Sequence, residues 1–365
     1  MSEWQTFCLK DLGKIVGGAT PPTNNPKNYG NKIAWITPKD LSTLQGRYIK
    51  KGSRSISRLG FKSCSCVLLP KRAILFSSRA PIGYVAIAEK RLCTNQGFKS
   101  IIPNKKIYFE FLYYLLKYHK DNISNIGGGT TFKEVSGATL GLFQVKIPPT
   151  YYEQQKIART LSILDQKIEN NHKINELLHT LAYKIYEYYF KYKPKNAKLE
   201  QIIIENPKSS IMVKNAQKTQ DKYPFFTSGD NTLSYPKAII DGRNCFLNTG
   251  GNAGIKFYVG KASYSTDTWC IGANEFSDYL YLLLSSIKTH INQSFFQGTS
   301  LKHLQKNLLK KYPIYMPSAH EIKKFNQIIM PLLTLISINT RTSKKLEQIR
   351  DFLLPLLLKQ QVKPQ

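Results

Sequence analysis

The chain has 365 residues, 42% of them hydrophobic, which is enough to form the cores of two or three domains. Its 53 Lys and Arg against 23 Asp and Glu give a formal net charge of +30, an excess that indicates a polyanionic partner. No apolar stretch approaches the roughly 20 residues of a membrane-spanning helix, and the start is polar, unlike a signal peptide, which excludes a membrane protein and predicts a cytoplasmic one.

Short apolar strands alternate with Gly, Pro and Asn turns in the first part of the chain, which is typical of an α/β or α+β domain. Pro148 and Pro149 end this part, and good helix formers follow at helical spacing. The same order then recurs, with Pro317 ahead of the second helical run. The predicted segments are a first domain at 1–150, a first long helix at 151–193, a second domain at 194–318 and a second long helix at 319–365. The predicted strands include 32–37, 65–69, 73–77 and 84–88 in the first domain and 237–240, 244–248 and 255–259 in the second.

One coiled-coil pattern occurs in both long helices at a constant separation of 168 residues (325 − 157). Its positions are spaced alternately four and three apart, as in a coiled-coil seam, and an Asn recurs in the middle of each seam. The first helix contains Ile157, Leu161, Leu164, Ile168, Asn171, Asn175, Leu178, Ala182, Ile185 and Tyr189, and the second contains Phe325, Ile329, Leu332, Ile336, Asn339, Ser343, Leu346, Arg350, Leu353 and Leu357. Because both seams are apolar and the chain must return, we predict that the helices, each roughly 60 Å long, pack antiparallel and hold the two domains at opposite ends.

The two globular segments are also distant copies of each other. The aligned pairs are Gly83 with Gly254, Thr94-Asn95 with Ser265-Thr266, and Gly129-Thr130 with Gly298-Thr299, at offsets of 171, 171 and 169. We therefore predict a mixed α+β fold with an internal pseudo-two-fold repeat, in which two α/β domains alternate with two helices that pair as an antiparallel coiled coil.

This architecture is compatible with two classes of function. Two basic domains on a rigid spacer suit a DNA target with two separated half-sites, because one turn of duplex is roughly 34 to 36 Å. The general alternative for a coiled coil is a scaffold, here with domains that bind RNA or DNA without sequence preference. The seam Asn has its own ordinary explanation, which is that it sets the register and orientation of the helices.

Seven motifs, in their order and spacing, resemble the specificity subunits of Type I restriction-modification systems, which contain two target-recognition domains and two helical spacers. The motifs are Trp35-Ile36-Thr37-Pro38-Lys39-Asp40, Ser78-Arg79-Ala80-Pro81-Ile82-Gly83, Thr94-Asn95-Gln96-Gly97, Gly128-Gly129-Thr130-Thr131-Phe132, Pro148-Pro149, Glu153-Gln154-Gln155-Lys156-Ile157-Ala158 and Ile349-Arg350-Asp351-Phe352-Leu353-Leu354-Pro355-Leu356-Leu357. The resemblance covers nearly the whole chain. It implies a non-catalytic subunit that binds double-stranded DNA, two modification subunits and restriction subunits. Tyr186, Tyr188 and Phe190 are candidates for a docking surface, with internal packing as the alternative.

The second half departs from this pattern, because it has no counterpart of the Trp-Ile-Thr-Pro segment. Tyr223-Pro224-Phe225-Phe226-Thr227-Ser228-Gly229 and Thr249-Gly250-Gly251-Asn252-Ala253-Gly254 occur there instead. These segments resemble a different branch of recognition domain. We therefore expect the two half-sites to differ in sequence, so that the target is asymmetric.

Motifs for catalysis are missing from the sequence. Neither Pro-Pro pair has the preceding Asn or Asp and following aromatic residue of a methyltransferase loop, and no Gly-x-x-x-x-Gly-Lys-[Ser/Thr] loop is present. The acids form no nuclease metal constellation, and Cys64 and Cys66 are predicted to be reduced strand residues on one face rather than metal ligands. We expect this chain to bind no cofactor; the resemblance implies modification subunits that use S-adenosylmethionine and restriction subunits that use ATP and Mg2+.

Lysine and arginine side chains that reach phosphates are expected to supply affinity, while sequence is read at the base edges. Arg79 is the leading candidate because it lies in a Gly/Pro turn, with a surface ion pair as the alternative. The DNA-binding candidates are Lys39, Arg54, Lys62, Arg72 and Arg79 in the first domain and Asn231, Arg243, Asn252, Lys256 and Lys302 in the second, while Arg47, Lys71 and Lys261 have the same character. For each of the others, a solvated surface charge is the alternative. Trp35 and Trp269 are expected to be core anchors.

Overall fold

The computed structural model describes residues 3–129, 133–216 and 222–364, so residues 130–132 of the predicted glycine motif lie outside the described residues. It divides into two compact units, and each long helix contributes to both. The first unit consists of residues 1–170 and 343–365, and the second of residues 171–342. No helix in the described residues is long and apolar enough to cross a membrane.

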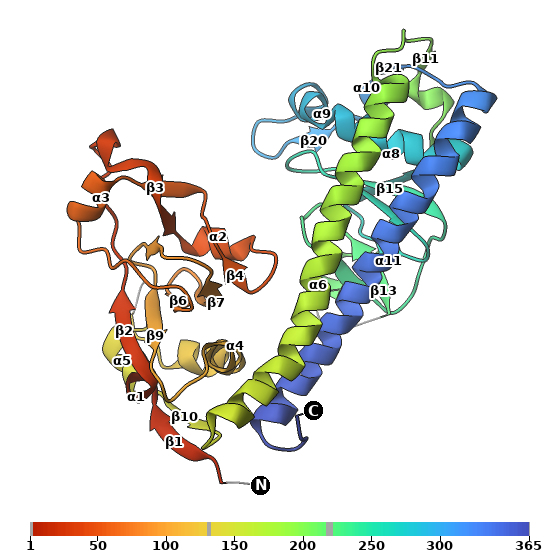
Figure 1. The fold of residues 1–365 in the computed structure, drawn as a ribbon. Helices are drawn as coiled ribbons and strands as arrows, with labels where there is room; N and C mark the ends of the chain where they lie inside the picture. The colour runs from red at the N-terminus through yellow and green to blue at the C-terminus, as the bar shows by residue number, and fades with distance from the viewer. Residues whose placement is uncertain (1–2, 130–132, 217–221, 365) are drawn as a thin grey trace. The chain divides into compact units, whose positions relative to one another are not determined.

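The first unit contains a five-stranded and a three-stranded sheet (Figure 1). The larger sheet has the order β2 (Gly13–Gly17), β9 (Lys99–Pro103), β6 (Ile74–Ser78), β7 (Ile82–Ala88) and β4 (Tyr48–Ile49), and the smaller one has the order β5 (Arg54–Ile56), β3 (Tyr29–Ile36) and β8 (Cys93–Thr94). The other elements are β1 (Gln5–Cys8), paired with β10 (Gln144–Ile147), and the short helices α1 (Leu9–Leu12), α2 (Pro38–Ser42), α3 (Arg58–Lys62) and α5 (Gly137–Leu142). Helix α4 (Phe109–Asn125) packs against β7, where Phe111, Leu112 and Leu115 are buried in the core.

The second unit repeats this arrangement with four strands in its main sheet instead of five. Its main sheet has the order β12 (Ile204–Glu205), β18 (Thr268–Gly272), β15 (Arg243–Asn248) and β16 (Ile255–Val259), and its smaller sheet has the order β14 (Leu233–Tyr235), β13 (Tyr223–Phe226) and β17 (Ser263–Tyr264). The other elements are the pairs β11 (Ala197–Lys198) with β21 (Pro313–Ile314) and β19 (Phe296–Gln297) with β20 (His303–Leu304), and the helices α7 (Val213–Ala216), α9 (Lys288–Ser294) and α10 (Lys306–Lys310). Helix α8 (Ser277–Ser286) packs on β15 and β16, as α4 packs on β7.

The predicted internal repeat is confirmed by the strand order and by equivalent backbone hydrogen bonds. The Asn95 N–H donates to the carbonyl of Ile36, and the Ser265 N–H donates to the carbonyl of Phe226. Asn95 therefore corresponds to Ser265, an offset of 170 (265 − 95) and one residue less than predicted. The same bonds place Phe226 where the first domain has Ile36, so the segment that lacked a counterpart has one in the backbone although its side chains differ.

Two predicted strands are wrong for the same reason in both halves. Residues 65–69 and 237–240 each form only an isolated bridge, Leu69 with Leu92 and Ile240 with Ala262. Proline has no N–H to donate to a strand ladder, and Pro70 and Pro236 border these segments. Apolar content alone therefore overstates strand formation here.

The two predicted long helices are α6 (Tyr151–Tyr186), which continues as one π-helical turn over Glu187–Lys191, and α11 (Ala319–Leu358). The two helices pack antiparallel. As residue numbers rise along α6 and its π-helical turn, the residues that they contact in α11 have falling numbers. The contacts are Asp165 with Arg350 at 2.7 Å, Asn175 with Asn339 at 2.9 Å, and Phe190 with Phe325 at 4.8 Å between ring centroids. Figure 1 shows α6 and α11 side by side. The predicted antiparallel pairing is confirmed.

Removing the Phe325 ring should destabilise the chain far more than removing an exposed ring from the same helix. Phe325 is fully buried against Phe190, so Phe325→Ala should lower the free energy of unfolding by about 3 to 5 kcal/mol. Phe352 is 68% exposed, and Phe352→Ala should change it by no more than about 0.5 kcal/mol. Urea unfolding followed by circular dichroism measures both, and equal losses would contradict the assigned seam.

Candidate nucleic-acid interface

Asp40 holds together two segments of the first domain that carry predicted DNA contacts. Its carboxylate accepts from the Thr37 N–H at 2.8 Å and from the Ser53 N–H at 2.7 Å. These bonds connect the start of α2, which carries Lys39, to the start of β5, which carries Arg54. Burial raises the pKa of Asp40, but the hydrogen bonds from Ser53 and Thr37 outweigh it and bring the pKa below its usual value. The acid therefore stays charged at neutral pH and braces this surface.

Four exposed cations of the first domain lie on or beside its short helices and strands. Lys39 and Arg54 are exposed, and the Arg54 guanidinium lies 4.5 Å from the centroid of the Tyr29 ring. Lys62 is also exposed, at the end of α3, which packs against β5. Arg72 lies on the turn before β6 with its guanidinium over the Phe109 ring of α4, at 5.0 Å. Packing on this ring already accounts for Arg72.

Arg79 forms the ion pair that was the alternative to a DNA contact. Its Nη1 is 3.5 Å from Glu134 Oε2, and Lys99 Nζ is 3.3 Å from Oε1 of the same acid. The backbone of Glu134 pairs with Gly128, so the acid holds both cations beside the glycine segment. Arg79 and Glu134 are about one-third exposed, and ion pairs in water contribute little. A phosphate can therefore replace this carboxylate without a large penalty.

The equivalent loops of the second domain are also joined. The Gly251 N–H donates to the carbonyl of Lys302 at 2.9 Å, and Gly250 bridges His303. This contact brings the β15–β16 loop, with Asn252, to the β19–β20 hairpin, with Lys302, and both side chains are exposed. Asn231 is exposed on the turn between β13 and β14. Loops at corresponding places in the repeat thus carry candidate contacts in both domains.

Two predicted contacts in the second domain are engaged internally. Arg243 forms a forked ion pair with Asp278, and its Nη1 donates to Thr334 of α11 at 2.9 Å. Burial raises the pKa of Asp278, and Arg243 opposes that rise. Lys256 Nζ donates to the carbonyls of Thr227 and Gly229, and burial lowers the pKa of Lys256. These partners favour a packing role over a DNA contact for both cations.

Arg47 is wrong as a predicted DNA contact. Its side chain is 3% exposed and forms ion pairs with carboxylates inside the first unit. Among the acids that sequence reasoning did not single out, Glu134 and Asp40 organise the candidate surface. The sequence held one indication of their role, because each lies in or beside a motif that carries the family resemblance, in a chain with few acids.

The expectations for tryptophan and cysteine have mixed outcomes. Trp35 and Trp269 are core anchors as predicted, with exposures of 4% and 3% and indole N–H bonds to the Ala19 carbonyl and to Glu205. Cys64 and Cys66 are not strand residues but lie in the irregular segment after α3, with their sulfur atoms 3.2 Å apart. Within the described ranges, no three His, Cys, Asp or Glu side chains gather in a way that would hold a metal ion.

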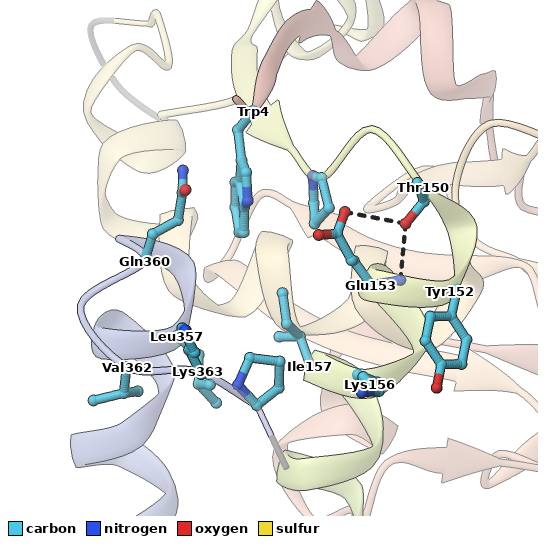
Figure 2. Close-up of a pocket in the computed structure, with 12 residues that line it drawn as sticks. Trp4, Thr150, Tyr152, Glu153, Lys156, Ile157, Leu357, Gln360, Val362 and Lys363 are labelled. Atoms are coloured by element: carbon cyan, nitrogen blue, oxygen red, sulfur yellow. Dashed lines mark hydrogen bonds between the residues drawn. The ribbon is translucent and has the colours of Figure 1, made fainter. Parts of the chain in front are cut away.

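A pocket of 470 Å³ lies elsewhere in the first unit, at the start of α6. Trp4, Ile157, Leu357 and Val362 are among the apolar side chains that line it, as Figure 2 shows. Thr150 caps the helix here, accepting from the Glu153 N–H at 3.2 Å. None of the predicted DNA contacts lines this pocket.

Known proteins with the same organisation identify the class. The Type I restriction modification DNA specificity domain family matches residues 1–180 and 195–348, and the chain belongs to this family. The MjaIX Type I restriction enzyme specificity subunit of Methanocaldococcus jannaschii is 33% identical, over 98% of this chain and 93% of that protein. The HindI specificity subunit of Haemophilus influenzae is 30% identical over 46% of this chain and 37% of its own length. The crystal structure of a Type I restriction-modification S subunit from M. genitalium has the same fold, with a TM-score of 0.63 and 17% identity, and the match covers 97% of this chain and 96% of that one.

Replacing Asp40 should loosen the brace between Lys39 and Arg54. Asp40→Asn keeps the shape but loses the charge that the two backbone N–H groups stabilise, so the free energy of unfolding should fall by about 1 kcal/mol at pH 7. Because the folded protein lowers the pKa of Asp40, this contribution is present above the unfolded pKa of about 4 and disappears as the pH falls through the folded pKa. Urea titrations at several pH values test this, and a difference that persisted at low pH would contradict it.

Proposed function

We propose that this chain is the DNA-recognition subunit of a Type I restriction-modification complex and that it reads a split, asymmetric target. The observation that carries the proposal is the repeated domain with different polar side chains at corresponding places. Arg79 and Lys99 flank the glycine segment of the first domain, whereas Asn252 and Lys302 occupy the corresponding loops of the second. Different side chains at base edges select different sequences.

Residues 1–150 and 194–318 are the proposed target-recognition domains, and 151–193 and 319–365 are the proposed spacer helices. Phosphate contacts from exposed cations supply affinity, and amide or arginine side chains supply base selection. We assign contacts to the exposed candidates Lys39, Arg54, Lys62, Asn231, Asn252 and Lys302 and to the partly exposed Arg79, while Arg72 is already accounted for by its packing on Phe109. Methyl transfer and cleavage belong to two modification subunits that use S-adenosylmethionine and to restriction subunits that use ATP and Mg2+.

The modification subunits need a surface on this chain, and the helix pair offers one within the second unit. Ile174, Leu177 and Leu181 of α6 and Leu335 and Ile338 of α11 are 41% to 71% exposed. Each directly precedes a seam residue, so these side chains form one stripe on each helix. Tyr188 extends the stripe and is 85% exposed, whereas Tyr186 and Phe190 are buried in the core.

The opposite side of the seam is already covered by the second domain. His179 and Ser337 each follow a seam residue, and they contact Tyr281 and the Val259 N–H. The exposed stripes therefore lie on the side away from the domain. An apolar face with a helical period accepts an amphipathic helix, and we assign it to helical segments of the modification subunits.

Methylation mapping of cells with and without this gene tests the proposed function. A motif of two unlike blocks around a fixed unspecified gap should be methylated only when the gene is present. Adenine is the expected methylated base in each block. If no split motif disappears with the gene, the proposal fails, and duplex binding that ignores sequence would instead favour a scaffold with nonspecific nucleic-acid domains.

A charge placed in the exposed stripe should separate assembly from DNA binding. Leu177 is 71% exposed, so Leu177→Glu should leave the isolated chain folded but weaken its affinity for the modification subunits by roughly 30-fold or more. Thr180→Glu, an exposed position of α6 outside the stripe, is the matched control and should assemble normally. Analytical ultracentrifugation of the mixed subunits measures both. Equal assembly by the two variants would exclude this docking face.

A further inference from the structure

A buried ion-pair network joins the first recognition domain to helix α6. Arg47 precedes β4, and its side chain is only 3% exposed. Its Nη1 donates to Glu110 Oε1 of α4 at 3.0 Å, and its Nε donates to Glu169 Oε1 of α6 at 3.1 Å. The backbone N–H of Arg47 also donates to this oxygen of Glu169, at 2.9 Å. One residue thus ties the edge of the main sheet to two helices.

Asp165 extends the network to the second long helix inside the same unit. Its Oδ2 accepts from the Tyr114 hydroxyl at 2.5 Å, and its Oδ1 accepts from Arg350 Nη1 of α11 at 2.7 Å. Arg47 Nε lies 4.0 Å from Asp165 Oδ2. Burial disfavours the charge on Arg350, but Asp165 outweighs this and raises the pKa of Arg350. Arg47 is shared by three carboxylates, so removing its guanidinium leaves buried acids without their main partner.

The helix repeat does not repeat this network. The counterparts at a separation of 168 are Leu333 for Asp165, Ser337 for Glu169 and Ala182 for Arg350. Leu333 and Ala182 belong to the apolar core of the second unit, and Ser337 accepts from the Val259 N–H at 3.0 Å. The helix pair packs against both domains through apolar cores, and in the first domain the Arg47 and Asp165 cluster adds a network that the second does not repeat at these positions.

We propose that Arg47 is a positioning residue that fixes the first recognition domain on the spacer helices and thereby sets the gap between the two half-sites. This inference rests on the proposed function. A planar guanidinium that binds carboxylates on two helices has a fixed fork geometry, so it adds a directional constraint to the apolar packing of the first domain on the helices. A domain that rocks on the spacer can meet half-sites at more than one separation, so the network determines the strictness of the gap rather than the sequence of either half-site.

The assembled complex of this chain with its modification subunits provides the test. It is offered duplexes that keep both half-sites constant and differ only in a gap changed by one or two base pairs. The wild-type complex should methylate duplexes of one gap length. The Arg47→Met complex should also methylate the neighbouring gap lengths, with its preference for the correct gap reduced by about tenfold, which is within the range of effects caused by one mismatched base pair. Arg47→Lys keeps the charge without the fork and should fall between them. An Arg47→Met complex as strict as the wild type overturns the inference.

Matched variants make the outcome decisive. Arg91 is an exposed arginine of the same domain, and Arg91→Met should keep the single gap. If Arg47→Met fails to fold, Glu169→Gln removes one charge while keeping the side-chain size, and a folded, strictly selective Glu169→Gln complex overturns the inference in its place. Thermal unfolding establishes which variants are folded. A wild-type complex that methylates all gaps equally counts against the proposed function itself, so the two failures are distinguishable.

Discussion

The packing of α6 against α11 is the constraint on which both units depend. In the first unit, Leu161 of α6 and Leu357 of α11 belong to the same buried cluster as Phe76 of the main sheet. In the second unit, Tyr186 and Phe325 share a cluster with the strands and helices of the second domain. The long helices are therefore walls of the domain cores rather than connectors laid over finished domains. A slip in the seam would displace both cores, which accounts for a seam that keeps one spacing while the domains diverge.

The positions on the two sides of the seam have different environments. Residues that follow seam positions, such as Ser337, contact the domains, while residues that precede them, such as Leu177 and Leu335, remain exposed. A helix pair with a covered side and an apolar open side can orient recognition domains and still accept further helices. The proposed docking of the modification subunits would give these exposed apolar side chains a role outside the core.

Sequence periodicity predicted the helices and the repeat because both rest on local spacing of apolar side chains. The correspondence between Phe226 and Ile36 could not be predicted from the sequence, because strand pairing uses backbone groups and does not require similar side chains. Arg47 was misassigned because its burial depends on Glu169, 122 residues away. The candidate surface was predicted by loop and residue type, but its acidic braces require the fold, since Asp40 meets Ser53 only after β3 and β5 pair.

Buried ion pairs also reduce the number of acidic groups on the surface. The chain has 53 Lys and Arg and 23 Asp and Glu residues. Several of the acids, including Asp165 and Asp278, form ion pairs with arginines inside the protein. Each such pair removes one positive and one negative charge from the surface, so the basic excess is unchanged but fewer exposed acids oppose it. Phosphate attraction depends on this exposed excess. By pairing with carboxylates inside the protein, Arg243 and Arg350 leave fewer acids on the surface to compete with phosphate for the exposed cations.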